Sequence, residues 1–255
     1  MYAEERQQAM ASLVGEHGRL SVAAIADRFG VTTETVRRDL STLERIGLVR
    51  RVHGGAVPAS SLAVIESGLG ERDQANTAEK ELIAKAALDE LPPPGGTVLI
   101  DAGSTTARFA SLLPRDHRLV VLTHAVPIAA RLAGLPHIDL YLLPGRVRTT
   151  TQAAVGSDTV RALGRLRVDV AFLGTNGISV RHGFSTPDEA EAATKRAMVR
   201  AAQRSVVLAD SSKLGREHLV RFAALEDVDA LVTDAEADPA AVAELEQAGI
   251  EVVVA

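Results

Sequence analysis

Residues 24–40 read AIADRFGVTTETVRRDL, a segment in which two helical patterns are separated by a turn. Apolar residues recur at helical spacing on both sides of Gly30, and glycine ends helices because it readily adopts a left-handed backbone. Thr32 and Thr33 can each cap the start of the second helix through a side-chain oxygen. We therefore predict a helix-turn-helix over about residues 20–39.

The flanking sequence extends this pattern in both directions. Residues 3–17 repeat apolar positions at helical spacing, and residues 48–53 alternate apolar and polar side chains before the Gly54-Gly55 turn. Helix, helix, turn, helix and hairpin is the element order of a winged helix-turn-helix. We expect that domain to occupy residues 1–57.

The rest of the chain is organised differently. Residues 58–75 lack sustained periodicity and are rich in Pro, Ser and Gly, so we interpret them as a linker. Over residues 76–255, apolar strands alternate with amphipathic helices, which is typical of an α/β domain whose parallel sheet is covered on both faces. Strands are expected at 97–101, 119–123, 138–143, 168–173, 205–209, 229–233 and 251–254, and helices at 77–90, 104–113, 126–133, 157–165, 188–203 and 239–248.

Positive charge is concentrated in the first domain. Residues 1–57 hold 8 Lys and Arg against 7 Asp and Glu, whereas the remaining residues hold 20 against 26. Basic groups on a short segment of an acidic chain indicate nucleic-acid binding, although the solvated face of a generic helical subdomain has the same appearance. Hydroxyl and guanidinium groups near the start of a helix can contact both base edges and phosphates. The candidate DNA-binding residues are Thr33, Thr35, Arg37, Arg38, Arg50, Arg51 and His53.

The segment at 24–40, continued by RVHGGA at 51–56, resembles the DeoR family of bacterial transcriptional regulators. Thr-Val-Arg-Arg-Asp-Leu followed at this distance by His-Gly-Gly-Ala is a specific combination. The resemblance covers almost all of the chain outside the linker. It implies an operator-binding winged helix followed by a sensor domain similar to ribose-5-phosphate isomerase and CoA-transferase folds.

Polar residues follow the predicted strands at several points of the second domain. Open parallel sheets bind ligands at the carboxyl ends of their strands, so these residues form a candidate binding site. Small residues at such turns also occur for structural reasons alone, and Lys195 stands four residues after Glu191, a spacing typical of an exposed ion pair. The candidates are Asp101, Gly103, Ser104, Thr105, Thr106, Arg146, Arg148, Gly174, Asn176, Gly177, Lys195 and Lys213.

The resemblance implies roles for several of these residues and adds two more. Lys80 is a further candidate from the first helix of the domain. His124 stands where the family often has Asn. It either contacts the ligand in a different way or is an ordinary histidine at the end of a strand. The phosphate of a sugar phosphate would be held by Gly103, Ser104, Thr105, Thr106 and Lys213, and the sugar would lie among Asp101, Asn176 and Lys195.

Several classes of catalytic and metal-binding protein are excluded. The chain has no Cys, which removes disulfides, thiolate zinc sites and cysteine nucleophiles. It has no P-loop, no G-x-S-x-G elbow and no His-x-x-x-His spacing. Where the isomerases carry the carboxylates of an Asp-Gly-x-Asp run, this chain has Leu173 and Asn176, and neither transfers protons near neutral pH. We therefore expect no catalytic residue, no metal and no cofactor.

Two alternatives to a ligand-responsive regulator stay open. One is a sugar-phosphate isomerase-like enzyme fused to a DNA-binding module, which would turn over pentose or hexose phosphates. The other is a constitutive DNA-binding protein with a scaffold domain, whose DNA affinity no sugar phosphate would change.

The combined prediction is a repressor of a sugar-catabolic operon that a phosphorylated sugar releases from double-stranded operator DNA. Its opening residues and sensor domain are most similar to the fructose-operon regulators of the family, which implies fructose 1-phosphate as effector. One helix-turn-helix reads too few bases to select an operator, so we expect a homo-oligomer, a dimer or a tetramer. No run approaches the roughly 18 apolar residues of a membrane span, and the N-terminus is too charged for a signal peptide. We expect no membrane contact and a cytoplasmic location.

Overall fold

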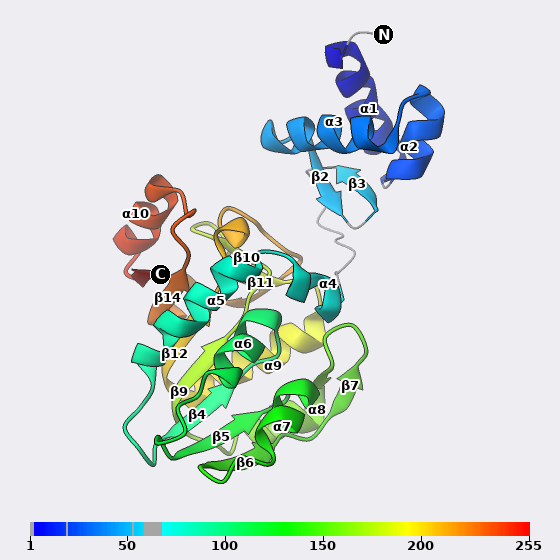
Figure 1. The fold of residues 1–255 in the computed structure, drawn as a ribbon. Helices are drawn as coiled ribbons and strands as arrows, with labels where there is room; N and C mark the ends of the chain where they lie inside the picture. Colours follow the sequence, from blue (N-terminus) through cyan, green and yellow to red (C-terminus); the bar gives the residue numbers. More distant parts are fainter. Residues whose placement is uncertain (1–2, 19, 53, 59–67) are drawn as a thin grey trace. The chain divides into compact units, whose positions relative to one another are not determined.

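The computed structural model describes residues 3–18, 20–52, 54–58 and 68–255. The chain forms two compact units, Met1–Ser67 and Gly68–Ala255 (Figure 1). In the described part of the chain, no helix combines the length and the apolar character that crossing a membrane requires.

The first unit contains three helices and a small antiparallel sheet. Met10, Val14, Ile25, Val36 and Leu40 are fully or almost fully buried and form the centre of its core. The sheet has the strand order β1-β3-β2. The elements are α1 Ala3–His17, β1 Leu20–Ser21, α2 Val22–Phe29, α3 Thr33–Arg45, β2 Val49–Val52 and β3 Gly55–Pro58.

The ends of α2 and α3 are fixed by the residues that the sequence marks. Ser21 Oγ accepts a hydrogen bond from the Ala24 N–H (3.1 Å) at the start of α2. Gly30 ends that helix with a positive φ of 63°, which a side chain would disfavour. Thr32 Oγ1 accepts from the Thr35 N–H (3.2 Å) and so caps α3. The turn between the two helices is therefore set by local chemistry.

A buried carboxylate fixes α1 against α3. Asp39 lies inside the first unit, where its oxygens accept hydrogen bonds from Arg6 Nε (2.7 Å) and Gln7 Nε2 (2.8 Å). A buried carboxylate requires such partners. The two arginines that precede it, Arg37 and Arg38, stay exposed. Within Thr-Val-Arg-Arg-Asp-Leu, the aspartate thus stabilises the fold while the arginines face solvent.

The structure differs from the sequence interpretation at the linker. Pro58 ends β3, and residues Leu69–Gln74 form the helix α4 where we expected no regular element. The Leu69 N–H donates to the Thr150 carbonyl (2.9 Å), and Arg108 forms an ion pair with Asp73. These contacts join residues far apart in the sequence, so periodicity within the segment could not reveal the helix.

The second unit is built on a seven-stranded parallel sheet, as predicted. Its strand order is β15-β14-β12-β9-β4-β5-β6, and every neighbouring pair is parallel. The strands are β4 Thr97–Ile100, β5 Leu119–Thr123, β6 Ile138–Leu142, β9 Val168–Leu173, β12 Ala202–Leu208, β14 Ala230–Thr233 and β15 Glu251–Val254.

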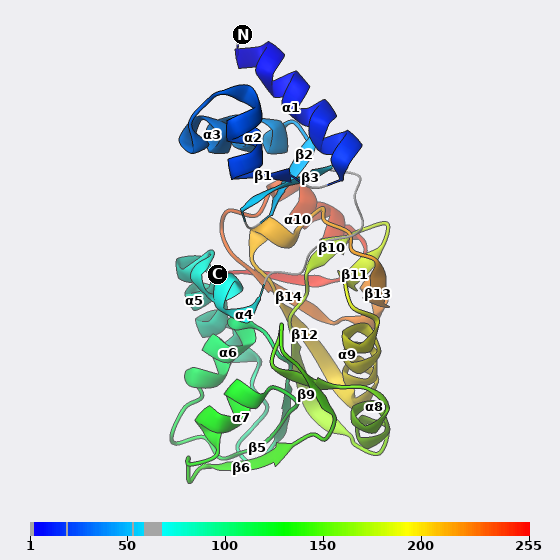
Figure 2. The same cartoon turned by 90° about the vertical axis from the view of Figure 1, so that its right-hand side faces the viewer.

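Helices cover both faces of this sheet (Figure 2). Ile83, Phe109 and Ile128 from α5, α6 and α7 pack on one face, and Leu163 and Met198 from α8 and α9 pack on the other. The helical elements are α5 Thr77–Ala86, the 3-10 turn η1 Ala87–Glu90, α6 Ser104–Ser111, α7 Val126–Leu132, α8 Ser157–Leu163, α9 Glu189–Ala201, the 3-10 turns η2 Ser211–Lys213 and η3 Leu225–Asp227, and α10 Pro239–Gln247.

In the second unit, five short strands were not predicted. They form a hairpin, β7–β8, and a three-stranded antiparallel sheet with the order β10-β11-β13. Each has only three or four residues, too few for an alternating pattern to stand out. Their bounds are β7 Arg146–Arg148, β8 Ala153–Val155, β10 Gly177–Ser179, β11 Gly183–Thr186 and β13 Val220–Ala223.

Candidate functional sites

Helix α3 presents a polar face that includes three of the candidate DNA-binding residues. Thr33, Arg37 and Arg38 are exposed, while Thr35 is half-buried and its hydroxyl lies 2.9 Å from Thr32 Oγ1. Arg37 Nη1 lies 3.4 Å from Glu34 Oε2 in an exposed pair. Such pairs restrain a side chain weakly, so Arg37 can leave Glu34 to contact DNA.

The β2–β3 hairpin adds a further arginine beside this face. Arg51 Nη1 donates to Ser41 Oγ (2.8 Å), and the Ser41 hydroxyl itself donates to the Arg37 carbonyl (2.8 Å). The Arg51 N–H also donates to Glu44 Oε1 (2.9 Å). The structure therefore brings Arg51 to the exposed side of α3. Arg50 lies in β2, and His53 lies outside the described residues.

In the second unit, the candidate residues gather at the carboxyl edge of the sheet. The β4–α6 loop supplies residues 101–106, β5 is followed by His124, β9 by Gly174 and β12 by the segment that leads to Lys213. Lys195 reaches the same edge from α9. Because all seven strands are parallel, their carboxyl ends meet at one edge of the sheet.

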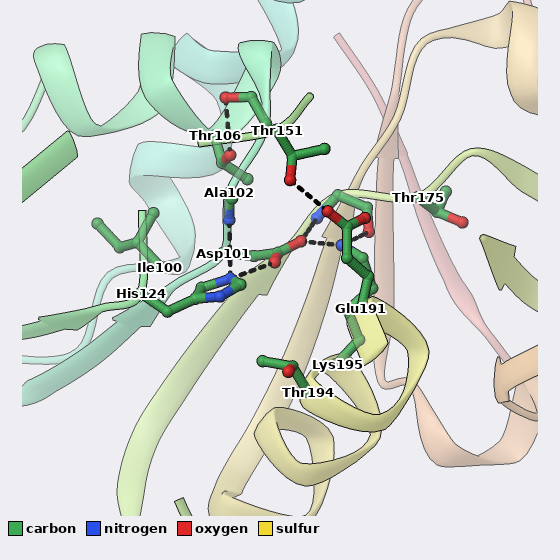
Figure 3. Close-up of polar contacts among 12 residues, drawn as sticks. Ile100, Asp101, Ala102, Thr106, His124, Thr151, Thr175, Glu191, Thr194 and Lys195 are labelled. Atoms are coloured by element: carbon green, nitrogen blue, oxygen red, sulfur yellow. Dashed lines mark hydrogen bonds and ion pairs between the residues drawn. The ribbon is translucent and has the colours of Figure 1, made fainter. Parts of the chain in front are cut away.

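A buried charged cluster lies at the end of β4 (Figure 3). Asp101 Oδ1 is 2.9 Å from His124 Nε2, and Asp101 Oδ2 accepts from Lys195 Nζ and from the Gly174 N–H (2.8 Å). Lys195 Nζ also donates to the Gly174 carbonyl (2.9 Å), and His124 Nδ1 donates to the Ala154 carbonyl (2.8 Å). Asp101, His124 and Lys195 thus form a closed network that connects β4, β5, β9 and α9.

The cluster fixes Asp101 as a carboxylate. Burial alone would raise the pKa of its carboxyl, but the Lys195 ammonium and the His124 ring hold that pKa well below its ordinary value. A carboxylate with such a low pKa is a poor proton acceptor near neutral pH. Asp101 is therefore suited to orienting its neighbours and unsuited to general base catalysis.

The start of α6 offers unpaired donors. Within the described part of the chain, the N–H groups of Ser104, Thr105 and Thr106 donate to no protein group, since the first backbone bond of the helix runs from Ala107 to Gly103 (3.0 Å). Ser104 and Thr105 are both buried, and their hydroxyls likewise have no hydrogen-bond partner among the described residues. Thr106 is fully buried, and its hydroxyl donates to the Gly103 carbonyl (3.1 Å).

Three cationic side chains belong to elements around this edge: Lys80 of α5, Arg108 of α6 and Lys213 of η2. Lys213 Nζ lies 3.3 Å from Ser212 Oγ and 3.8 Å from Asp210 Oδ2, and burial lowers the pKa of Lys213 while Asp210 opposes that shift. Burial lowers the pKa of Lys80 to about 8; Asp210 counteracts it, and the positive charges of Lys213 and Arg108 lower it further. Lys80 therefore lies in a region that holds three cations together with the carboxylates of Asp210 and Asp73.

Lys80 also stabilises the end of helix α4. Its ammonium donates to the carbonyls of Arg72 and Ala75, at the end of α4. These two bonds satisfy carbonyls that the helix end leaves without partners. Lys80 thus connects the cationic region to the first helix of the second unit.

Other candidates lie in different surroundings. Arg148 binds Glu191 Oε1 (2.6 Å) and Asp188 (3.2 Å) at the start of α9, and Arg146 is exposed on β7. Because Glu191 is buried against Arg148, the exposed ion pair between Glu191 and Lys195 that the spacing allowed does not form.

Asn176 and Gly177 follow β9 and differ in their availability. The Asn176 side chain is half-buried and has no hydrogen-bond partner among the described residues, so it is available to a ligand. A Cβ at Gly177 would lie 2.5 Å from the Arg216 carbonyl oxygen. Close packing therefore requires glycine at position 177.

Sequence reasoning missed two residues at this edge. Asn76 adopts a left-handed backbone (φ 51°) directly before α5, and its Nδ2 donates to Asp210 Oδ1 (2.8 Å). Asparagine is among the few side chains that tolerate this conformation. Arg108 stands four residues after Ser104, and its Nη1 donates to the Ser104 carbonyl (3.4 Å). That helical spacing could have revealed Arg108.

No metal centre is evident in the described residues, which contain no group of three or more His, Asp or Glu side chains placed to hold an ion. Among the described residues, the polar groups without a protein partner at this edge include the hydroxyls of Ser104 and Thr105 and the N–H groups at the start of α6, beside ammonium groups that already have protein partners. Such donors suit an anion better than a cation.

Two family models match the chain. Residues 6–61 match a DeoR-like helix-turn-helix domain, and residues 75–235 match the DeoR C-terminal sensor domain. The chain is 38% identical over 253 residues to the HTH-type transcriptional regulator GlpR of Haloferax volcanii, covering 99% of this chain and 98% of that protein. It is 35% identical to the uncharacterized HTH-type transcriptional regulator FruR of Bacillus subtilis, over 92% of this chain and 93% of that protein.

A solved structure of ribose 5-phosphate isomerase A from Methanocaldococcus jannaschii is also similar. It matches 55% of this chain and 55% of its own, with 20% identity and a TM-score of 0.41.

Proposed function

The chain belongs to the DeoR family of transcriptional regulators, and from that premise we propose that a phosphorylated sugar in its second unit releases its winged helix from operator DNA. The regulated operon, in this proposal, is one for sugar catabolism, and the protein acts as its repressor. Fructose 1-phosphate is the first effector to test. The protein works where the DNA is, in the cytoplasm.

One observation carries the proposal: unpaired donors and cations converge at the carboxyl edge of the sheet. Among the described residues, the N–H groups at the start of α6 and the hydroxyls of Ser104 and Thr105 have no protein partner, and Lys80 feels the charges of Arg108 and Lys213. A helix start with free N–H groups favours an anion, and charge-assisted hydrogen bonds are the strong kind. A phosphate dianion fits this combination of donors and positive charge.

The remaining groups suit a polyhydroxylated ligand. Asn176 offers an amide that has no partner among the described residues, and the Asp101–Lys195 network lies in the adjoining loops. An amide both donates and accepts hydrogen bonds, as sugar hydroxyls do. The sugar therefore lies, in this proposal, on the Asn176 side of the phosphate.

Ligand binding can alter DNA binding only if the sugar phosphate prefers the state that does not bind DNA. Helix α4 is the candidate transmitter, because it is the first helix of the second unit and two of the site residues hold it. Lys80 caps its end, and Arg108 binds Asp73. A phosphate that draws these cations toward itself would change the position of α4.

An enzymatic role is not favoured. Asp101, Glu191 and Asp210, three carboxylates close to the site, are each paired with a cation. Leu173, which stands where the isomerases have a carboxylate, is fully buried in the core. The relatives of this chain are regulators, and we assign no catalytic residue.

Thermal-shift screening of the full chain against sugar phosphates tests the ligand class. A ligand at a concentration 100 times its Kd adds about 2.7 kcal/mol of stability, which corresponds to roughly 5–10 °C for a domain of this size. We expect such a shift from at least one sugar phosphate and none from the matching unphosphorylated sugar. Equal shifts from both would contradict the phosphate assignment.

Arg37→Ala tests the proposed recognition helix. The loss of a base or charged contact is expected to weaken operator binding by more than about 1 kcal/mol, or roughly fivefold. Fluorescence anisotropy with labelled operator measures the change. Arg115→Ala, an exposed arginine of the second unit, is the matched control and should bind as the wild type does.

Arg51→Ala tests the wing. Because we assign Arg51 to a phosphate contact, its loss should weaken binding by a similar factor on all DNA sequences. It should also reduce the slope of log affinity against log salt concentration by about one. The slope of log affinity against log salt concentration gives the result. If the Arg37 and Arg51 variants both keep wild-type affinity and slope, α3 and the hairpin do not read DNA.

A further inference from the structure

Strand β6 (Ile138–Leu142) is the unprotected edge of the seven-stranded sheet. It is the last strand in the sheet order, and among the described residues it pairs with β5 alone. Both ribbon views place it at the lower margin of the second unit (Figures 1 and 2). An edge strand leaves half of its backbone donors and acceptors without partners in the sheet.

The hydrogen bonds between β5 and β6 show which backbone groups of β6 have no partner in the sheet. The Leu119 N–H donates to the His137 carbonyl (3.1 Å), and the Leu143 N–H donates to the Thr123 carbonyl (2.9 Å). In a strand, successive residues turn to opposite sides. The backbone N–H and C=O groups of the odd-numbered residues of β6 thus point toward β5. The backbone N–H and C=O groups of Leu140 and Leu142 point away from it.

Two large side chains of this edge are exposed. Tyr141 is 55% exposed and Leu142 is 56% exposed. Folded proteins usually protect a sheet edge with Lys, Pro or a bulge. Strand β6 has none of these, and its single charge is Asp139. An apolar edge of this kind is suited to pairing with another strand.

We propose that β6 pairs antiparallel with β6 of a second copy of this chain, about a two-fold axis at Leu140. The Leu140 N–H of each copy then donates to the Leu140 carbonyl of the other. The Leu142 N–H donates to the Ile138 carbonyl of the other copy, while the Ile138 N–H keeps its own bond to Leu135 (3.1 Å). The pairing joins the two parallel sheets into one continuous sheet.

This register also suits the side chains. An axis at Leu140 places Asp139 of each copy opposite Tyr141 of the other, and all five residues of β6 are paired. An axis at Asp139 would set two carboxylates against each other, which is destabilising. The strand is therefore complementary to itself, which favours a second copy over an unrelated partner.

The two-fold axis agrees with the mode of DNA binding. Helix-turn-helix modules act as symmetric pairs on inverted half-sites, and a two-fold interface uses the same patch on both chains. This link to operator symmetry rests on the proposed function, whereas the pairing itself can be measured without DNA or ligand. Failure of one experiment therefore leaves the other interpretable.

Because the chain contains no Cys, engineered cysteines report the register directly. Asp139→Cys and Tyr141→Cys chains are mixed in equal amounts and oxidised. Opposed residues of this type have Cα atoms about 4.5 Å apart, which permits a disulfide. We expect a cross-linked dimer from the mixture and little from either variant alone. Val254→Cys, exposed on β15 at the other edge, is the control and should not cross-link.

A second measurement tests whether the edge carries the association. Leu142→Pro removes only an outward-facing N–H, which an edge strand tolerates, and Leu142→Lys adds a charge at an exposed position. Light scattering at micromolar concentration should show that each variant has half the mass of the wild type, while Val254→Lys leaves the mass unchanged. A monomeric wild type, an unchanged mass in both Leu142 variants or cross-linking at position 254 alone would overturn the proposal.

Discussion

Asp101→Ala is expected to lower the free energy of unfolding of the second unit by about 3–5 kcal/mol. Asp101 is buried with Lys195, whose ammonium would keep its bond to the Gly174 carbonyl and its place over the ring of Phe222, 5.5 Å from Nζ, but would lose its anionic partner. Removal of one member of a buried ion pair leaves the other charge uncompensated, which is why the cost exceeds that of losing one hydrogen bond. The Gly174 N–H loses its acceptor as well.

Hydrogen exchange measures this change in the second unit alone. The amides of β4 and β9 lie at the centre of the sheet and exchange when the unit opens. We expect their exchange to accelerate by roughly two to more than three decades. Asp116→Ala removes an exposed carboxylate and should change stability by less than about 0.5 kcal/mol. Equal exchange rates in the two variants would show that the cluster does not stabilise the unit.

A double variant separates the charge from the packing. In Asp101→Asn combined with Lys195→Met, neither charge is left buried alone, so the loss of stability should be smaller than the sum of the two single effects. The folded-state pKa of Asp101 lies below its unfolded value, so its contribution is present above about pH 4 and is lost as the pH falls toward the lowered pKa. Additive single effects would show that Asp101 and Lys195 are not coupled.

Lys213→Ala is expected to weaken sugar-phosphate binding by about one to two decades while leaving operator affinity unchanged. A charge-assisted hydrogen bond in a partly buried site contributes about 1.5–3 kcal/mol, and each 1.4 kcal/mol is tenfold in affinity. The variant should stay on the operator at sugar-phosphate concentrations that release the wild type. In a cell this is a super-repressed phenotype. Calorimetry on the full chain gives the affinity.

Two further variants test whether the loss of affinity comes from contacts to the phosphate group. Thr105→Val removes a hydroxyl that has no partner among the described residues. It should weaken binding of the same sugar phosphate, but by less than Lys213→Ala does. Lys85→Ala removes an exposed lysine of α5 and should leave the affinity unchanged. If wild type and Lys213→Ala bind the sugar phosphate equally well, the loop after β12 is not part of the site.

The winged helix could be predicted closely because its determinants are local. Ser21, Gly30 and Thr32 cap or end the helices within three or four residues of the groups they satisfy. The parallel sheet was equally visible, since each of its strands is a short apolar run between amphipathic helices. In both cases the relevant interactions lie within one sequence window.

The details of the second site depend on contacts between distant residues. Asp101 meets Lys195 across 94 positions, and Asn76 meets Asp210 across 134. No short stretch of sequence contains such a pair. Periodicity and spacing therefore predicted that polar residues lie at the carboxyl edge of the sheet, but not which of them form hydrogen bonds and ion pairs with one another. The resemblance suggested Lys80 as a site residue, but its bonds to the carbonyls of Arg72 and Ala75 depend on α4, a helix that the sequence did not predict.

In the proposed function, a phosphorylated sugar bound to the second unit releases the winged helix from DNA. The most direct test is fluorescence anisotropy of a labelled operator, selected by the chain from random DNA, at fixed salt concentration. Fructose 1-phosphate, or the sugar phosphate that most stabilises the chain, should release the operator at concentrations at least about tenfold below any effect of the same sugar without phosphate. An operator that stays bound at saturating concentrations of every sugar phosphate, or that both forms of the sugar release equally, would contradict the account.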